Sequence, residues 1–367
     1  MSGVRHLYVH LPFCASRCGY CAFVVEVGAL DRRDAYLDAL LAELDRESGR
    51  LGTLETVYLG GGTPSLMRPR RIARLLDALA PRLAPGAEIT IEANPETIEG
   101  RALRDLRLAG VNRLSLGVQS FQPHLLRALE RQATPDQARQ AARCARRAGF
   151  EDLSIDLLFG VPGQTPADLE ADLAEALALA PDHLSWYELE LKPGSRLASN
   201  GTEPYDEDEA ADAYRRVVAG LEDAGYRWYE TANFARSGHR CRHSLAYWGA
   251  ADYLGIGVGA VSTVDGVRWR NAPGLGRYLA ALAAGGEPPR TREPLDPDTV
   301  RRERWMLGLR LDEPLDVAWA GAPDFPEAVA RLRRLGLVAE GGDEDLALTR
   351  EGRFLQNSVL HQLMEYV

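Results

Sequence analysis

The sequence predicts an α/β fold, a partial (β/α)6 barrel followed by a small C-terminal α+β domain. Short apolar runs alternate with longer helical patterns over the first 225 of the 367 residues, and this alternation is typical of right-handed crossovers onto a parallel sheet. A doubly wound sheet shows the same alternation. The barrel is favoured because most residues with recognisable chemistry follow directly after strand-like runs, and this is the ligand face of a barrel.

The predicted elements of the barrel follow one another in a regular order. Six short apolar runs are interpreted as strands, and the longer patterns between them are typical of helices. The predicted strands are residues 7–11, 56–59, 88–92, 113–118, 153–159 and 183–191, and the helical patterns include 34–47, 72–79, 135–148 and 166–179.

The rest of the chain predicts a barrel extension and a separate C-terminal unit. We expect a barrel over 1–225, an extension over 226–290 that contains a glycine-rich stretch, and a terminal domain over 291–367. The order of elements in the terminal domain resembles a winged helix. The expected elements are a helix at 206–224, a strand at 226–231, a linker at 285–289, helices at 298–309 and 326–335, a hairpin at 337–348 and a helix at 350–365.

Composition limits the class of protein. The net charge is −10, with 46% hydrophobic and 26% charged residues, which is typical of a globular chain and argues against unspecific binding to nucleic acid or anionic lipid. No signal peptide precedes the first strand, and no apolar run approaches the ~20 residues of a spanning helix. We therefore expect a cytoplasmic protein. This expectation is compatible with a peripheral position at a membrane, held there through a partner.

Three of the five cysteines, Cys14, Cys18 and Cys21, form a CxxxCxxC motif directly after the first predicted strand. Thiolates are the natural ligands of iron–sulfur clusters, and three thiolates for four irons leave one iron open to chelate a small ligand. Tyr20 flanks the sulfurs and can exclude water. The alternative is a structural zinc site with His10 as a fourth ligand.

The second predicted strand ends in three glycines, Gly60–Gly62, followed by Thr63. Glycines at a strand end allow backbone N–H and C=O groups to approach a ligand closely. A glycine triplet is more often a simple turn. Its place one βα unit after the cysteine motif favours the ligand-binding interpretation.

These motifs and others in the same order resemble the oxygen-independent coproporphyrinogen III oxidase family of radical S-adenosylmethionine (SAM) proteins. The resemblance covers nearly the whole chain and implies a partial barrel, one [4Fe–4S] cluster and bound SAM. The matching segments are Tyr8-Val9-His10-Leu11-Pro12-Phe13-Cys14 and residues 60–65, 92–95, 117–121, 131–132 and 156–165.

The resemblance also implies which side chains contact SAM. Carboxylates such as Glu92 and Asp156 can accept hydrogen bonds from ribose hydroxyls or an amino group, and Arg131 can pair with a carboxylate. Taken singly, Asp156 could be a capping carboxylate, Gln119 a buried amide and Arg131 a surface charge. The matching positions are Tyr8, Gly61, Gly62, Thr63, Glu92, Gln119, Arg131 and Asp156.

Two departures separate this chain from the oxidases it resembles. Those enzymes carry a further cysteine where this chain has Phe23, and an N-terminal extension where only seven residues precede Tyr8. The resemblance therefore favours the family's HemW-type heme chaperone branch, although Ala22 stands where that branch has an acidic residue. The alternative function is a radical enzyme of porphyrin metabolism, and the sequence leaves open whether SAM is cleaved.

The chaperone branch implies heme as a ligand, heme-accepting proteins such as membrane respiratory enzymes, and an electron donor such as flavodoxin. The branch also carries an HNxYW-like element followed by a glycine-rich run; here residues 243–248 read His-Ser-Leu-Ala-Tyr-Trp, with Ser244 in place of the asparagine. A neutral imidazole, here His243, is a standard axial ligand of heme iron, and the glycines that follow could admit a flat ligand. The alternative is that His243 makes local hydrogen bonds and Trp248 is core; Cys144 and Cys241 are interpreted as ordinary thiols.

Nucleic acid is not an expected partner of the C-terminal domain. Acidic residues in its predicted wing, among them Glu340 and Asp345, would repel phosphate. We expect this domain to pack on the barrel or to dock a partner.

Overall fold

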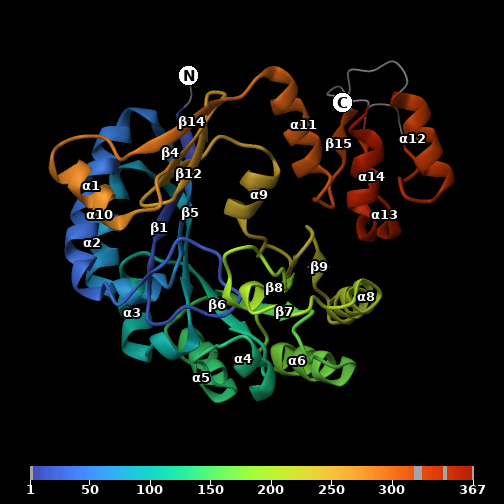
Figure 1. The fold of residues 1–367 in the computed structure, drawn as a ribbon, viewed down its shortest axis with the longest axis horizontal. Helices are drawn as coiled ribbons and strands as arrows, with labels where there is room; N and C mark the ends of the chain where they lie inside the picture. The colour runs from blue at the N-terminus through green and yellow to red at the C-terminus, as the bar shows by residue number, and fades with distance from the viewer. Residues whose placement is uncertain (1–2, 318–324, 342–344, 366–367) are drawn as a thin grey trace.

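The computed structural model describes residues 3–317, 325–341 and 345–365. Its largest element is a nine-stranded sheet in the order β11-β1-β4-β5-β6-β7-β8-β10-β9. The six central strands run parallel, and helices cover their outer face (Figure 1). These strands are β1 (Val4–Leu11), β4 (Leu51–Gly61), β5 (Leu83–Ala93), β6 (Arg113–Gln119), β7 (Asp152–Phe159) and β8 (His183–Glu188).

The predicted order of strands and helices agrees with this sheet. Each of the six predicted strands falls in one central strand, and the expected parallel pairing is confirmed. The last predicted strand was too long, because β8 ends at Glu188 and the chain then turns. The helices between the strands are α1 (Arg33–Glu47), α2 (Pro69–Leu79), α3 (Gly100–Leu108), α4 (Pro123–Ala128), α5 (Pro135–Arg147) and α6 (Pro166–Ala178).

Capping residues explain where several of these helices begin. Thr134 caps α5 and Thr165 caps α6, each in a reciprocal capping box with the residue three positions later. Both helices also have proline at their first position, where a missing backbone N–H removes no helical hydrogen bond. Asp206 caps the next long helix, α8 (Glu207–Asp223), by accepting from two backbone N–H groups.

The outer and inner faces of the barrel strands differ in character. Side chains facing the helices are aliphatic and almost fully buried, for example Leu59, Ile91 and Leu114. The inner face carries small hydroxyl side chains instead of the bulky branched residues that usually fill a closed barrel. These hydroxyl residues are Thr90, Ser115, Ser154 and Ser185.

The segment after α8 adds edge strands to the main sheet. The strand β11 (Leu254–Ile256) pairs parallel with β1, whereas β10 (Asn233–Ala235) and β9 (Arg227–Trp228) continue the sheet antiparallel beyond β8. A second sheet packs beside this edge and includes the chain on both sides of α10 (Leu275–Ala283). Its strands are β12 (Val261–Val264), β13 (Val267–Asn271) and β14 (Arg290–Pro294).

The glycines of this segment do not leave an open face for a flat ligand, which corrects that expectation. A Cβ on Gly255 would lie 2.1 Å from the carbonyl oxygen of Val261, and one on Gly257 would lie 2.6 Å from the hydroxyl of Tyr36. The backbone N–H of Gly257 donates to the buried carboxylate of Glu43. These glycines therefore allow β11 to pack tightly against the chain's own backbone and side chains.

The C-terminal segment has its own apolar core around Trp305, Leu332 and Val359. The predicted hairpin is present as a bridge between Val338 and Leu348, although part of its turn lies outside the described residues, with Asp343 and Glu344. The elements are α11 (Pro297–Gly308), β15 (Leu315–Asp316), α12 (Phe325–Arg334), β16 (Asp345–Leu346), α13 (Arg350–Phe354) and α14 (Gln356–Leu363).

The last predicted helix is two helices, and Leu355 separates them with φ −104° and ψ 22°. The break lets the two halves face different surfaces. Phe354 packs against Trp228 of β9, while Val359 enters the core of the C-terminal segment. Arg353 stabilises the contact between α13 and β9. Its guanidinium lies 3.6 Å from the centre of the Trp228 ring and donates to the Trp228 carbonyl.

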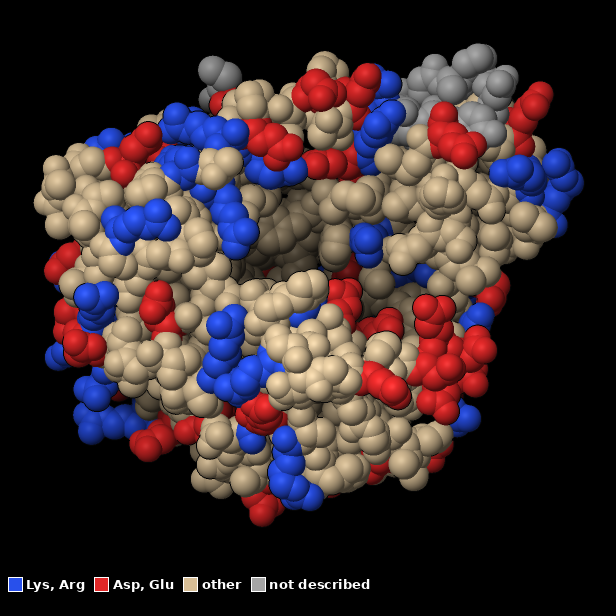
Figure 2. Space-filling view, in the orientation of Figure 1, with Lys and Arg blue, Asp and Glu red and all other residues tan. Residues whose placement is uncertain are grey.

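The face shown in Figure 2 is hollowed near its centre, and acidic side chains gather over α8. Among the described residues, no helix combines the length and the apolar character that crossing a membrane requires.

Candidate functional site beside the cysteine loop

The cysteine loop leaves the sheet directly after β1 and closes on itself. The short strands β2 (Phe13–Cys14) and β3 (Glu26–Val27) pair in parallel and bring the two ends of the loop together. Gly19 anchors the middle of the loop, because its N–H donates to the Leu129 carbonyl and its carbonyl accepts from the Leu197 N–H. The loop is therefore held at its base and at its tip.

A cavity of about 630 Å³ lies between this loop and the inner face of the barrel. That volume is within the usual range of small-molecule sites. The structure brings most of the predicted site residues together around it. Those that line the cavity are Cys14, Cys18, Cys21, Tyr20, Gly61, Gly62, Thr63, Glu92, Gln119, Arg131 and Asp156.

The three thiols of the motif share one cavity wall. All three line the same cavity, yet no three His, Cys, Asp or Glu side chains in the described ranges are close enough to share one metal ion. In an iron–sulfur cluster each thiolate binds a different iron, so wider spacing is expected. Two neighbours already donate to the sulfurs: Thr63 to Cys14 at 3.6 Å and Arg131 to Cys18 at 3.5 Å.

His10 does not supply the fourth ligand that the zinc alternative needs. Its ring is buried, Nε2 lies 2.8 Å from the Val24 carbonyl oxygen, and Nδ1 lies 3.0 Å from the Tyr8 hydroxyl. Tyr8, predicted to contact SAM, is absent from the cavity wall and stacks on Tyr58. Tyr8 thus supports the site by holding His10 and Tyr58.

The glycine strip at the end of β4 brings that strand close to the cysteine loop. A Cβ on Gly61 would lie 2.6 Å from the His10 ring, and one on Gly62 would lie 2.6 Å from the Pro12 carbonyl oxygen. Gly61 also has φ 115°, which side chains disfavour. The Thr63 N–H then donates to the Phe13 carbonyl at 2.8 Å. Close approach to the protein itself therefore explains these glycines at least as well as approach to a ligand.

Two carboxyl groups, those of Glu92 and Asp156, line the cavity. Glu92 accepts from the Tyr58 hydroxyl at 2.8 Å and from the Gly61 N–H at 3.1 Å, and burial, with the negative charge of Asp156, raises the pKa of Glu92 to about 7. Burial also raises the pKa of Asp156, which accepts from hydroxyls including Ser115 at 2.8 Å. A cationic ligand would favour the ionised form of both groups.

Arg131 is not a surface charge, because its guanidinium is held inside the site. Nη2 donates to the carbonyl of Gly117 at 2.6 Å and to the side-chain oxygen of Asn94 at 3.1 Å. Its Nε is buried without a hydrogen-bond partner in the described part of the chain. An unpaired buried donor beside Cys18 suits an anionic group of a bound ligand.

The His243 ring, predicted as a heme ligand, lies in a closed environment. It belongs to α9 (Arg242–Trp248) and is 1% exposed. Nδ1 lies 2.7 Å from the Thr56 hydroxyl and Nε2 lies 3.0 Å from the Tyr247 hydroxyl. Burial lowers the pKa of His243 to about 3. The geometry agrees with the local hydrogen bonds of the alternative interpretation, because heme ligation would require these contacts to break, whereas Trp248 is only partly buried.

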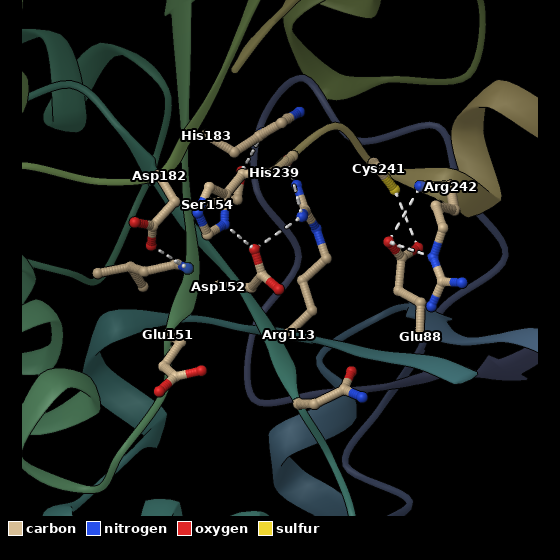
Figure 3. Close-up of polar contacts among 12 residues, drawn as sticks. Glu88, Arg113, Glu151, Asp152, Ser154, Asp182, His183, His239, Cys241 and Arg242 are labelled. Atoms are coloured by element: carbon tan, nitrogen blue, oxygen red, sulfur yellow. Dashed lines mark hydrogen bonds and ion pairs between the residues drawn. The ribbon is translucent and has the colours of Figure 1, made fainter. Parts of the chain in front are cut away.

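Sequence reasoning missed the polar floor of the barrel, where Figure 3 shows charged side chains from several strands. Arg113 donates to the His239 carbonyl at 3.0 Å and lies 3.6 Å from Asp152. Glu88 accepts from the backbone N–H of Arg242 at 3.0 Å and lies 3.6 Å from the sulfur of Cys241. These contacts hold the loop before α9 against the floor of the barrel.

The sequence did carry a signal for the polar interior, because polar and apolar residues alternate along the strands. Successive inward positions on a strand are two residues apart. In β6 these positions are Arg113, Ser115 and Gly117, and in β7 they include Ser154 and Asp156, all of which line the cavity. Polar residues at alternate positions of otherwise apolar strands therefore marked the cavity wall.

The chain is similar to several known proteins. Residues 8–176 match the sequence model of the radical SAM superfamily. The chain is 38% identical to the heme chaperone HemW of Mycobacterium tuberculosis, over 98% of this chain and 94% of that protein. It is 36% identical to the heme chaperone HemW of Escherichia coli, over 96% of each chain.

A solved structure shares the fold over the whole chain. It is the coproporphyrinogen III oxidase HemN from Escherichia coli, described as a radical SAM enzyme. The TM-score is 0.86 at 27% identity, and the match covers 100% of this chain and 91% of that one. This likeness agrees with a radical SAM barrel followed by a C-terminal domain.

Proposed function

This chain belongs to the HemW family of heme chaperones within the radical SAM superfamily, and we propose that it binds heme and passes it to heme-accepting proteins. The supporting observation is the extent of the match to proteins named as heme chaperones. These relatives are 32–38% identical and align over 96–98% of the chain. The match therefore includes the barrel, its extension and the C-terminal segment.

The radical SAM superfamily implies a [4Fe–4S] cluster and SAM, and the cavity beside the cysteine loop fits both. Cys14, Cys18 and Cys21 would hold three of the irons. When bound, the cluster supplies an open iron that chelates SAM and an electron that can cleave it. Thr63 and Arg131 donate hydrogen bonds to the sulfurs of Cys14 and Cys18, as donors to cluster ligands would.

The remaining wall of the cavity fits SAM, which carries an ammonium, a sulfonium, a carboxylate and ribose hydroxyls. Glu92 and Asp156 would accept from its donors and offset its positive charges. Arg131 would pair with its carboxylate through the unpartnered Nε. Gln119 and the backbone of Gly61–Thr63 line the same wall, and Tyr20 would exclude water beside the sulfurs.

The heme proposal rests on the family match and on aromatic surface at the cavity mouth. Phe23 is 68% exposed and Tyr187 is 44% exposed, and both line the cavity. Exposed aromatic rings offer a flat apolar surface on which a porphyrin can stack. This arrangement supports heme binding near the mouth without ligation by the enclosed His243. Its acceptors would be hemoproteins, with membrane respiratory enzymes among the candidates.

A second candidate function is oxygen-independent coproporphyrinogen III oxidase activity. The full-length structural likeness to that enzyme favours it. The identity is lower than to the heme chaperones, and Phe23 stands where the resembled oxidases have a further cysteine. The chaperone function is therefore favoured.

One pair of assays distinguishes these functions. The anaerobically reconstituted protein is incubated with SAM, reductant and coproporphyrinogen III, and a parallel sample is titrated with heme. We expect about one heme per chain and no decarboxylated product. Catalytic formation of vinyl product would contradict the chaperone proposal, as would the absence of saturable heme binding.

A further inference from the structure

A second groove lies on the outer side of the cysteine loop. Its wall includes Ala15, Ser16 and Arg17, the three residues between Cys14 and Cys18. Three residues line both this groove and the cavity, so one layer of chain separates the two spaces. The shared residues are Ser16, Arg17 and Arg131.

The groove is basic in a protein that is acidic overall. Arginines at four positions and a single glutamate line it, whereas the whole chain has net charge −10. These arginines come from three separate segments, which are the cysteine loop, the end of α4 with the turn that follows it, and α7 (Arg196–Ser199). The charged residues are Arg17, Arg127, Arg131, Arg196 and Glu130.

The contacts of these arginines leave much of their positive charge uncompensated. Among the described residues, Arg17 donates only to the carbonyls of Cys21 and Phe23, both at 3.3 Å. Arg196 pairs with Glu130 and also donates to the Arg17 carbonyl. In the described ranges of the chain Arg127 makes no ion pair or hydrogen bond through its side chain. The fixed guanidinium of Arg17 and the unpaired Arg127 therefore present net positive charge to solvent.

Apolar side chains accompany this charge. Val27 lies in the groove and is 50% exposed, and Phe23 on the same loop is 68% exposed. A protein–protein interface commonly combines an exposed apolar centre with arginine around it. Weak electron-transfer complexes use small surfaces of this kind. A groove for single-stranded nucleic acid would instead present several aromatic rings along its length.

We propose that this basic groove docks an acidic one-electron carrier protein, which reduces the cluster through the loop between Cys14 and Cys18. The inference rests on the cluster in the proposed function. One electron passes from the reduced carrier to the oxidised cluster, the carrier is oxidised by one electron, and no bond forms or breaks. Complementary charge would speed the encounter of the two proteins.

The test compares charge reversal in the groove with the same change far from it. Arg127→Glu removes the unpaired cation, and Arg334→Glu is the matched control because Arg334 is exposed at the end of α12, remote from α4 in Figure 1. Arg127→Lys tests charge without the guanidinium. The probe is a reduced acidic flavodoxin, and dithionite serves as a small reductant that needs no docking surface.

Two measurements are made on each variant: the dissociation constant for flavodoxin, and the rate of cluster reduction by stopped flow. At low ionic strength Arg127→Glu should slow reduction by flavodoxin about tenfold, within the range that electrostatic steering provides. It should also weaken flavodoxin binding, and added salt should reduce both differences. Arg127→Lys, Arg334→Glu and all rates with dithionite should stay near the wild-type values.

Equal effects of Arg127→Glu and Arg334→Glu would overturn the proposal, because net charge alone would explain them. Slower reduction by dithionite would also overturn it, since the loop itself would then be perturbed. Tighter, Arg127-dependent binding of a single-stranded oligonucleotide would assign the groove to nucleic acid instead. Flavodoxin binding is also measured on protein without the cluster, so a failure to assemble the cluster is distinguishable from a failure to dock.

Discussion

The two ends of the barrel cavity are built from the same strands but differ in how their polar groups are paired. At the floor, Glu88 accepts from the backbone N–H groups of Arg242 and His243, both at 3.0 Å. At the mouth, burial and Asp156 raise the pKa of Glu92 to about 7, and Nε of Arg131 has no partner among the described residues.

This difference separates structure from binding within one cavity. Of the floor side chains named above, only Arg113 has a buried nitrogen, Nη2, without a partner in the described part of the chain, and the network closes the barrel. The mouth has groups whose preferred partners are supplied by a charged ligand. Changes at the floor should therefore affect folding, whereas changes at the mouth should affect ligands.

The largest expected difference is in cluster content, between variants of the cysteines at the mouth and at the floor of the cavity. Cys14→Ser, Cys18→Ser and Cys21→Ser should each abolish the [4Fe–4S] cluster, because each removes one thiolate ligand. Cys241→Ser at the floor should retain about four irons and four sulfides per chain. Iron and sulfide analysis after anaerobic reconstitution measures this, and cluster loss in Cys241→Ser would refute the assignment. Cys144→Ser is a second control.

At the floor, Arg113→Met should reduce the free energy of unfolding by about 2–3 kcal/mol. Breaking a fully buried ion pair is worth about 3–5 kcal/mol, and the value is lower here because the Asp152 side chain is 35% exposed. Denaturant unfolding measures the change. SAM affinity measured well below the unfolding midpoint should stay within twofold of wild type; a large loss would show that floor and mouth act as one site.

At the mouth, Arg131→Ala should weaken SAM binding about ten- to a hundredfold, since a charge-assisted hydrogen bond is worth ~1.5–3 kcal/mol. Asp156→Ala should act in the same direction. Equilibrium titration of the cluster-containing protein measures both. Cluster content must be matched between variants, because Arg131 also contacts Cys18. Unchanged affinity in both variants would place SAM elsewhere.

SAM affinity should also rise with pH through the pKa of Glu92, about 7. The ionised carboxylate accepts from SAM and offsets its positive charge, whereas the protonated form does neither. Between pH 6 and pH 8 the ionised fraction rises about tenfold, which sets the upper limit of the effect. Glu92→Gln should bind more weakly and with a flatter pH profile; an equally steep profile would assign the pH dependence to another group.

The smallest effect on ligands is expected at His243. His243→Gln should leave heme affinity and the Soret spectrum close to those of the wild type, because the ring is enclosed and both nitrogens have hydroxyl partners. The free energy of unfolding of this variant should fall by about 1 kcal/mol, because the hydrogen bonds of the replaced side chain are weakened. A lost or shifted Soret band in folded protein would restore His243 as the heme ligand.

The sequence was sufficient where function depends on residues close together in the chain. The cysteine motif and the polar residues after the strands predicted the barrel and most of the cavity wall, because strand order places their ends at one edge. It was insufficient where contacts are made between distant segments. The enclosure of His243 depends on Thr56, and the basic groove joins Arg17, Arg127 and Arg196 from three elements.

Other differences arose from packing that periodicity does not encode. The final helix breaks at Leu355, where the partly buried Phe354 and the buried Val359 pack against different parts of the molecule. The glycines at 255 and 257 resemble an open binding strip in sequence, but their empty Cβ positions are filled by Val261 and Tyr36. In both cases the deciding neighbour lies outside the local pattern.

The contact between the glycine strip and the cysteine loop has a thermodynamic consequence. The Gly62 N–H donates to the Leu11 carbonyl at 2.9 Å, and the Thr63 N–H donates to the Phe13 carbonyl, so the wall of the cavity and the base of the loop share hydrogen bonds. Ordering one segment also orders the other. Cluster assembly and SAM binding are then linked equilibria, and each must strengthen the other by the same factor.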